Sequence, residues 1–115
     1  MRVQLSVPCA TASNAFYFAP LLPCILRAAN YVANQNQAST KTCVISKNGG
    51  NTIISGDLSA TAGTPTEGTL TPTLADKKQV ISKTAPLLIT INLTGGTAAQ
   101  VILDLDFDEF QVNTE

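Results

Sequence analysis

The chain has 115 residues, of which 44% are hydrophobic and only 13% are charged, and its net charge is −1. This length fits one domain and leaves no room for two, so residues 1–115 are expected to form a single domain. The seven basic residues are scattered and form no basic stripe, which argues against binding to nucleic acid.

The first residues do not look like a secretory signal, because no long apolar run follows Met1-Arg2. The apolar stretch from Ala15 to Leu22 is broken by Pro20 and is too short to span a bilayer. We therefore expect a product that is made and folded in a cytoplasm and has no membrane partner.

The three cysteines fit the same compartment. Cys9, Cys24 and Cys43 are odd in number and widely spaced, which argues against a disulfide framework. The chain has no CxxC pair and no histidine, so a zinc site is not expected either. We predict that the three thiols are small buried hydrophobes and that the protein needs no metal and no cofactor.

The first expected strand runs from Arg2 to Val7 and alternates cleanly between polar and apolar residues. Its apolar members, Val3, Leu5 and Val7, are predicted to point inward. Pro8 is predicted to end the strand, because proline cannot donate a hydrogen bond to a strand ladder.

A second short strand is expected at Ala15–Ala19, and it holds three of the six aromatic residues. Phe16 and Phe18 are predicted to fill the core while Tyr17 packs on a neighbour, since aromatic side chains dominate core burial. A sugar-binding platform is the alternative interpretation of this aromatic cluster.

The segment Cys24–Ala33 is ambiguous, because Leu26, Ala29 and Val32 have the spacing of a helix face. The proline that precedes it, Pro23, and the asparagines that follow it favour a strand that runs into a loop. We predict a strand.

The strands expected at 42–47 and 51–55 flank Asn48-Gly49-Gly50, which is the clearest hairpin signal in the chain. Hydrophobicity falls after residue 55. An edge strand at 68–74 would tolerate Pro72, because an edge position needs no donor on its outer side.

The pattern alternates again near the C-terminal end of the sequence. A strand is expected at 86–94, and Gly95-Gly96 is predicted to form a second hairpin turn into a last strand at 98–110. The last strand places apolar residues on one face and acidic residues on the other: Val101, Leu103, Leu105 and Phe107 against Asp104, Asp106 and Asp108. Short strands at this spacing predict an all-β fold, a single antiparallel β-sandwich with the topology of a jelly roll.

The residue types that are missing argue against catalysis. Without histidine the chain has no Ser-His-Asp or Cys-His arrangement and no proton shuttle near neutral pH. It also has no SxxK or GxSxG sequence. We therefore expect that the protein is not an enzyme and has no catalytic residues.

The acidic run from Asp104 to Glu109 resembles the start of a calcium loop, with carboxylates at alternate positions. Such a loop needs glycine at its sixth position, where this chain has Glu109. The glutamate that would close the loop is missing. Same-face residues of a strand lie about 6.7 Å apart, too far for three of them to surround one cation. The expected role is an acidic row that faces solvent or a neighbouring subunit, and a cation held by Asp104, Asp106 and Asp108 at a subunit interface stays open.

The order of these features resembles a known family across nearly the whole chain. The opening strand Val3–Pro8, the small residues before Phe16-Tyr17-Phe18-Ala19-Pro20, the Thr/Gly-rich middle from Ala60 to Thr73 and the closing Val101–Phe107 carry the resemblance. The family is that of the small jelly-roll or β-sandwich decoration (cement) proteins on the heads of tailed bacteriophages. This resemblance implies a homotrimer that binds the major capsid protein on the capsid surface, stabilises the shell and has no catalytic residues.

Two functions follow from the sequence. The first is a virion structural protein of the capsid surface that oligomerises and cements a phage head. The second is a β-sandwich binding module, such as a head fibre or an adhesin, that recognises carbohydrate or a receptor through Tyr17, Tyr31 and the loop Asn30–Asn36.

Overall fold

The computed structural model describes residues 1–48, 50–71 and 80–109, which form ten strands and no helix. The all-β prediction is therefore confirmed. The strands are β1 (Arg2–Cys9), β2 (Ser13–Phe18), β3 (Cys24–Ala33), β4 (Thr42–Lys47), β5 (Thr52–Asp57), β6 (Thr66–Glu67), β7 (Thr69–Leu70), β8 (Val80–Ile81), β9 (Leu87–Asn92) and β10 (Ala99–Glu109).

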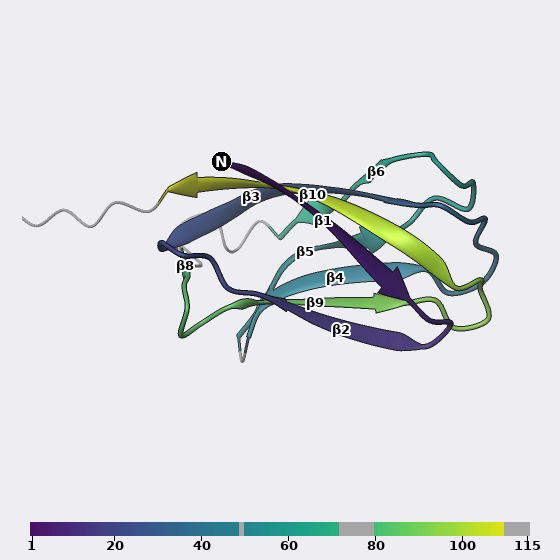
Figure 1. Ribbon diagram of the computed structural model, residues 1–115, viewed down its shortest axis with the longest axis horizontal. Helices are drawn as coiled ribbons and strands as arrows, with labels where there is room; N and C mark the ends of the chain where they lie inside the picture. The colour runs from purple at the N-terminus through teal and green to yellow at the C-terminus, as the bar shows by residue number, and fades with distance from the viewer. Residues whose placement is uncertain (49, 72–79, 110–115) are drawn as a thin grey trace, which may run out of the picture.

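Two antiparallel sheets pack face to face, as Figure 1 shows, so the β-sandwich prediction is confirmed. Sheet A has the strand order β1-β10-β3-β6, and β8 also pairs with β3. Sheet B has the strand order β2-β9-β4-β5-β7. Strands that follow one another in the chain therefore often lie in opposite sheets. The first strand and the last, β1 and β10, pair with each other in sheet A.

The core lies between the two sheets and is built by period-two alternation. In β10 the predicted inner face is fully buried, and Phe107 stacks on Phe18 of the opposite sheet with 5.5 Å between the ring centroids. In β9, Ile89 and Ile91 are buried in the same way. Each such apolar side chain contributes about 1.5–3 kcal/mol on burial before entropy is subtracted, so these two strands are central to stability.

A β-bulge explains the helix-like spacing of β3. The register of β3 against β10 shifts between Asp106 and Phe107, and Arg27 is skipped in the pairing. One extra residue on a strand reverses which side chains point inward. Leu26 and Ala29 are therefore both buried although they are three residues apart, and the prediction of a strand is confirmed.

The first strand continues through its proline, so the prediction that Pro8 ends it is wrong. Pro8 lies inside β1 and opposite Gln100 of β10. β1 is an edge strand of sheet A. At this position the missing N–H would point away from β10, so the ladder loses no bond.

The turn at Gly95-Gly96 was expected to form a hairpin, and this expectation is wrong. Gly95 has a φ of 76°, a left-handed conformation that favours glycine, so the turn itself is present. However, β9 belongs to sheet B and β10 to sheet A. The turn carries the chain from one sheet to the other.

The other expected turn does form a hairpin, because β4 and β5 pair as antiparallel neighbours around Asn48-Gly49-Gly50. Gly49 itself lies outside the described residues. In the expected edge strand at 68–74 only Thr69–Leu70 is a strand, and residues 72–74 lie outside the described part. The same holds for Phe110, at the end of the expected last strand.

Candidate functional site

The acidic row of β10 lies on the outer face of sheet A, as predicted. Asp104 forms an ion pair with Arg2 of β1, and this pairing raises the pKa of the guanidinium. Asp108 accepts a hydrogen bond from Nε of Arg27 at 2.8 Å. Two of the three carboxylates thus have a partner on a neighbouring strand, and ion pairs as exposed as these contribute little to stability, because water screens them.

The row does not form a metal site by itself. Among the described residues, no group of three or more His, Cys, Asp or Glu side chains is placed to hold a cation. The three carboxylates stand in single file along one strand, and two of them already face a guanidinium. The role that the geometry supports is a charged strip on one face of the sandwich.

The three cysteines are buried and unbridged, as predicted. Burial raises the pKa of the Cys9 thiol to about 11 and that of the Cys43 thiol to about 12. Burial raises the pKa of Cys24 as well. A thiol that stays protonated at neutral pH is a poor nucleophile, so these groups act as core side chains.

The two tyrosines do not share a surface. Tyr31 is buried between the sheets, so the prediction that it helps to form a binding site is wrong. Tyr17 is 64% exposed on the outer face of sheet B, so the prediction that it packs on a neighbour is also wrong. Phe16 and Phe18 pack against the core as expected.

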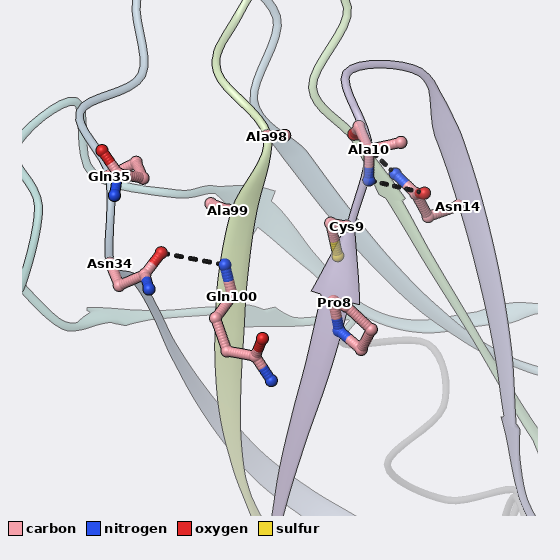
Figure 2. Close-up of a pocket in the computed structure, with 9 residues that line it drawn as sticks. All are labelled: Pro8, Cys9, Ala10, Asn14, Asn34, Gln35, Ala98, Ala99 and Gln100. Carbon is pink, nitrogen blue, oxygen red and sulfur yellow. Dashed lines mark hydrogen bonds between the residues drawn. The ribbon is translucent and has the colours of Figure 1, made fainter.

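An open hollow of about 540 Å³ lies at the end of the sandwich where β1 ends and β10 begins. Figure 2 shows its lining, which is rich in side-chain amides from Asn14, Asn34, Gln35 and Gln100. Asn34 Oδ1 accepts a hydrogen bond from the backbone N–H of Gln100 at 2.8 Å. Asn14 is used similarly, since it bonds the backbone of Ala10 through both its amide oxygen and its amide nitrogen.

The opposite end of the sandwich is apolar. The connection between β2 and β3 carries Leu21 and Leu22, which are 82% and 66% exposed, and Met1 beside them is 58% exposed. They border a pocket of about 320 Å³ whose lining is almost entirely apolar, with Phe18, Pro20 and Pro23 among its walls. We call this surface, formed by Met1, Phe18 and residues 20–23, the apolar end.

Sequence reasoning missed the apolar end. The signal was two adjacent leucines between two prolines, Pro20 and Pro23, outside any alternating segment. Proline fixes φ and lacks an N–H donor, so two prolines this close disfavour a strand, and the two leucines lie in the connection between β2 and β3. Large apolar side chains that gather on a surface in this way mark sites of contact with other molecules.

The outer faces of the two sheets differ in charge. Sheet A carries the acidic row together with Arg2, Arg27 and Glu67. The outer face of sheet B has few charges. Ala15, Val44 and Thr90, which the register places in one row across β2, β4 and β9, are short and uncharged, and Asp57 is an exposed carboxylate at the end of β5. The molecule therefore presents one charged face and one nearly uncharged face.

The part of the chain that the structure describes holds no helix with the length and apolar character needed to cross a bilayer. No protein family, curated protein or solved structure matches the chain.

Proposed function

We propose that the protein is a non-catalytic virion structural protein: a decoration protein that oligomerises, binds the major capsid protein on the surface of a tailed phage head and stabilises the shell. The observation that carries the proposal is the apolar end, where Leu21 and Leu22 stand in solvent beside an apolar pocket. Burying such side chains against a partner gains about 25 cal/mol per Å² of apolar surface. Two neighbouring leucines that stay exposed to water gain none of this free energy.

The surface composition supports the same role. Short polar side chains on the outer face of sheet B lose little conformational entropy when a partner covers them. Tyr17 stands among them and is exposed, and tyrosine is enriched at protein interfaces. A face of this kind suits close packing between protein subunits.

The jelly-roll topology is part of the proposal. Four antiparallel pairs nest within one another along the chain: β1 with β10, β2 with β9, β3 with β6 and β4 with β5. A long hairpin that is rolled up so that successive pairs fall alternately into two sheets would give this order. Jelly rolls of two packed sheets are common in viral capsid domains.

The experiment is a binding assay with capsids of the encoding phage from which this protein has been stripped. The double variant Leu21→Ser/Leu22→Ser removes the two most exposed side chains of the apolar end. It should weaken capsid binding at least about tenfold, because burial of two leucine side chains gains more than the roughly 1.4 kcal/mol that a tenfold change represents. Leu70→Ser is the matched control, since Leu70 is 36% exposed on β7, away from the apolar end. Equal binding by all three proteins, or no binding by the wild type, would contradict the proposal.

A second candidate function is favoured by the amide-rich hollow of Figure 2. Asn34 and Gln35 belong to the loop that was predicted to recognise carbohydrate, and amides are suitable partners for sugar hydroxyls. Saturable binding on a glycan array, lost in Gln35→Ala but retained in Leu21→Ser/Leu22→Ser, would favour a binding module over a decoration protein.

A further inference from the structure

One side of the sandwich is open. Within the described residues β1 pairs only with β10, and β2 pairs only with β9, so each forms the edge of its sheet. β1 and β2 run along the same side, because the start of β1 and the end of β2 line the apolar pocket while the end of β1 and the start of β2 line the hollow. Figure 1 shows both strands, in purple, meeting at the short connection between them.

The hydrophobic core is incompletely covered along this open side. The apolar side chains that pack on the core but are only partly buried are Val3, Leu5, Val7, Phe16 and Phe18. All of them belong to β1 or β2. The side chains that a further neighbour would cover are therefore concentrated along these two edges.

The hydrogen-bonding groups of β1 that point outward follow from its register. Met1 and Phe107 exchange two hydrogen bonds, each of 2.8 Å, so they form a hydrogen-bonded pair. Such pairs alternate along an antiparallel ladder, so Val3, Leu5 and Val7 bond to β10 as well. The N–H and C=O groups of Arg2, Gln4 and Ser6 consequently point away from sheet A.

This edge has little protection against pairing. Proteins that must keep an edge strand free shorten it, place lysine or proline on it, or interrupt it with a bulge. In β1 a charge and a proline occur only near its two ends, at Arg2 and Pro8, and its pairing with β10 has no register shift. The five residues between them form a regular, uncharged edge.

We propose that β1 pairs in antiparallel fashion with β1 of a second copy of this chain, across a two-fold axis at Gln4. In this register Gln4 faces Gln4 of the second copy, and Arg2 faces Ser6 twice. Three pairs with two bonds each give about six backbone hydrogen bonds, and every outward N–H and C=O from Arg2 to Ser6 has a partner. Pro8 lies beyond the paired stretch, so its missing N–H costs nothing.

The side chains are compatible with this contact. Val3 of each copy lies opposite Leu5 of the other copy on the inner face of the sheet. These partly buried side chains of the two β1 strands therefore cover one another. The two Arg2 side chains are offset by four residues along the strands, about 13 Å, and each is already paired with Asp104 of its own chain. The edge is thus self-complementary in its backbone hydrogen bonding, and the contact brings no like charges close together.

This inference goes beyond the proposed function, because it concerns the β1 edge and not the exposed leucines that carry the capsid contact. The two surfaces adjoin at Val3, which also lines the apolar pocket. A two-fold contact predicts even numbers of copies, whereas the trimer implied by the family resemblance needs another contact. Loss of the β1 pairing would leave capsid binding through the apolar end untouched, so the two proposals can fail independently.

The first test measures self-association by sedimentation velocity over a range of concentrations. Gln4→Pro removes the backbone N–H that points away from sheet A and leaves every hydrogen bond to β10 in place. The variant should weaken association at least about tenfold. Ala15→Pro is the matched control. The backbone N–H of Ala15 points away from β9 at the middle of the β2 edge, so the variant loses no bond to β9 and should associate like the wild type. A monomeric wild type, or equal association of both variants, would overturn the proposal.

The second test identifies the register without proline. Residues on a two-fold axis lie about 5.5 Å apart in a hydrogen-bonded pair, which a disulfide can bridge. Gln4→Cys should therefore form a covalent dimer under mild oxidation, whereas Ser6→Cys, whose copies are about 13 Å apart along the strands, should not. The native thiols are buried and do not compete. Efficient cross-linking of Ser6→Cys, or none of Gln4→Cys, would show that the strands do not pair in this way.

Discussion

Tyr31 shows most clearly how single residues determine the packing of this core. Its ring fills the space between the sheets, and its hydroxyl has no hydrogen-bond partner among the described residues. Gly56 makes room for it, because the Tyr31 hydroxyl oxygen is the atom that a Cβ on Gly56 would meet first. A Cβ on Gly68 would meet Cγ2 of Ile54 first and would lie 3.2 Å from the Tyr31 hydroxyl. The need for glycine at position 56 comes from a contact across the sandwich, between β5 of sheet B and β3 of sheet A.

A double-mutant cycle tests this contact. Tyr31→Phe should leave the free energy of unfolding unchanged or raise it by up to about 1 kcal/mol, because it removes a buried hydroxyl that lacks a partner. Gly56→Ala should lower it by about 1–3 kcal/mol through overpacking. In the Tyr31→Phe background the cost of Gly56→Ala should fall by at least half, since the next atoms lie 3.7 Å away. Additive effects in denaturant unfolding would contradict the contact.

Burial of ionisable groups predicts a loss of stability at high pH. The pKa of Tyr31 is raised to about 12 and that of Cys43 to about 12, both mainly by burial, from ordinary values of 10.0 and 9.0. Folding therefore favours the protonated groups. Their contribution is present in full below pH 9 and is lost as the pH rises from there through about 12.

The measurement is the thermal unfolding temperature between pH 7 and pH 12. We expect it to change little up to about pH 9 and then to fall steadily, and Tyr31→Phe should make the fall shallower. A decline that begins well below pH 9, or a profile that stays flat to pH 12, would contradict burial of these groups.

The connections between strands depend on polar side chains that no periodicity reveals. Gln37 is buried in the loop after β3 and fixes this loop to the turn after β9. Its Nε2 donates to the carbonyl oxygen of Thr97 at 2.7 Å, and its Oε1 accepts from the Thr97 N–H at 2.9 Å. One side-chain amide thus satisfies both the N–H and the C=O of Thr97, at the point where the chain passes from sheet B to sheet A.

Replacing this amide should destabilise the fold. Gln37→Ala leaves the N–H and C=O of Thr97 without a partner, and we expect the free energy of unfolding to fall by about 1–3 kcal/mol. Gln35→Ala, two residues earlier and exposed, should change it by less than about 0.5 kcal/mol. Denaturant titration of both variants makes the comparison, and equal effects would show that the tether is unimportant.

The sequence predicts strands where polar and apolar residues alternate without a break. It does not predict which strands pair with one another. β10 is clear in the sequence because four apolar residues alternate with acidic ones along it. In β3 the bulge at Arg27 breaks the period and gives a helix-like pattern. The turn at Gly95-Gly96 is visible as local chemistry, but whether the next strand joins the same sheet depends on distant contacts.

At the scale of the whole molecule, the two ends and the two faces differ. The apolar end is opposite an amide-rich end, and a charged outer face is opposite a nearly uncharged one. The acidic row could be predicted, because it follows from alternation in a single strand. The apolar end has only a weak signal in the sequence, two leucines between two prolines, because the exposure of Leu21 and Leu22 depends on how the sheets leave their connection uncovered.

Imaging of whole particles shows whether the protein is a building block of a phage head. Electron cryo-microscopy of particles of the encoding phage should show density of the size of this β-sandwich on the outer surface of the capsid, with the apolar end against the shell. Capsids without such density, or density confined to the tip of a fibre, would contradict the account.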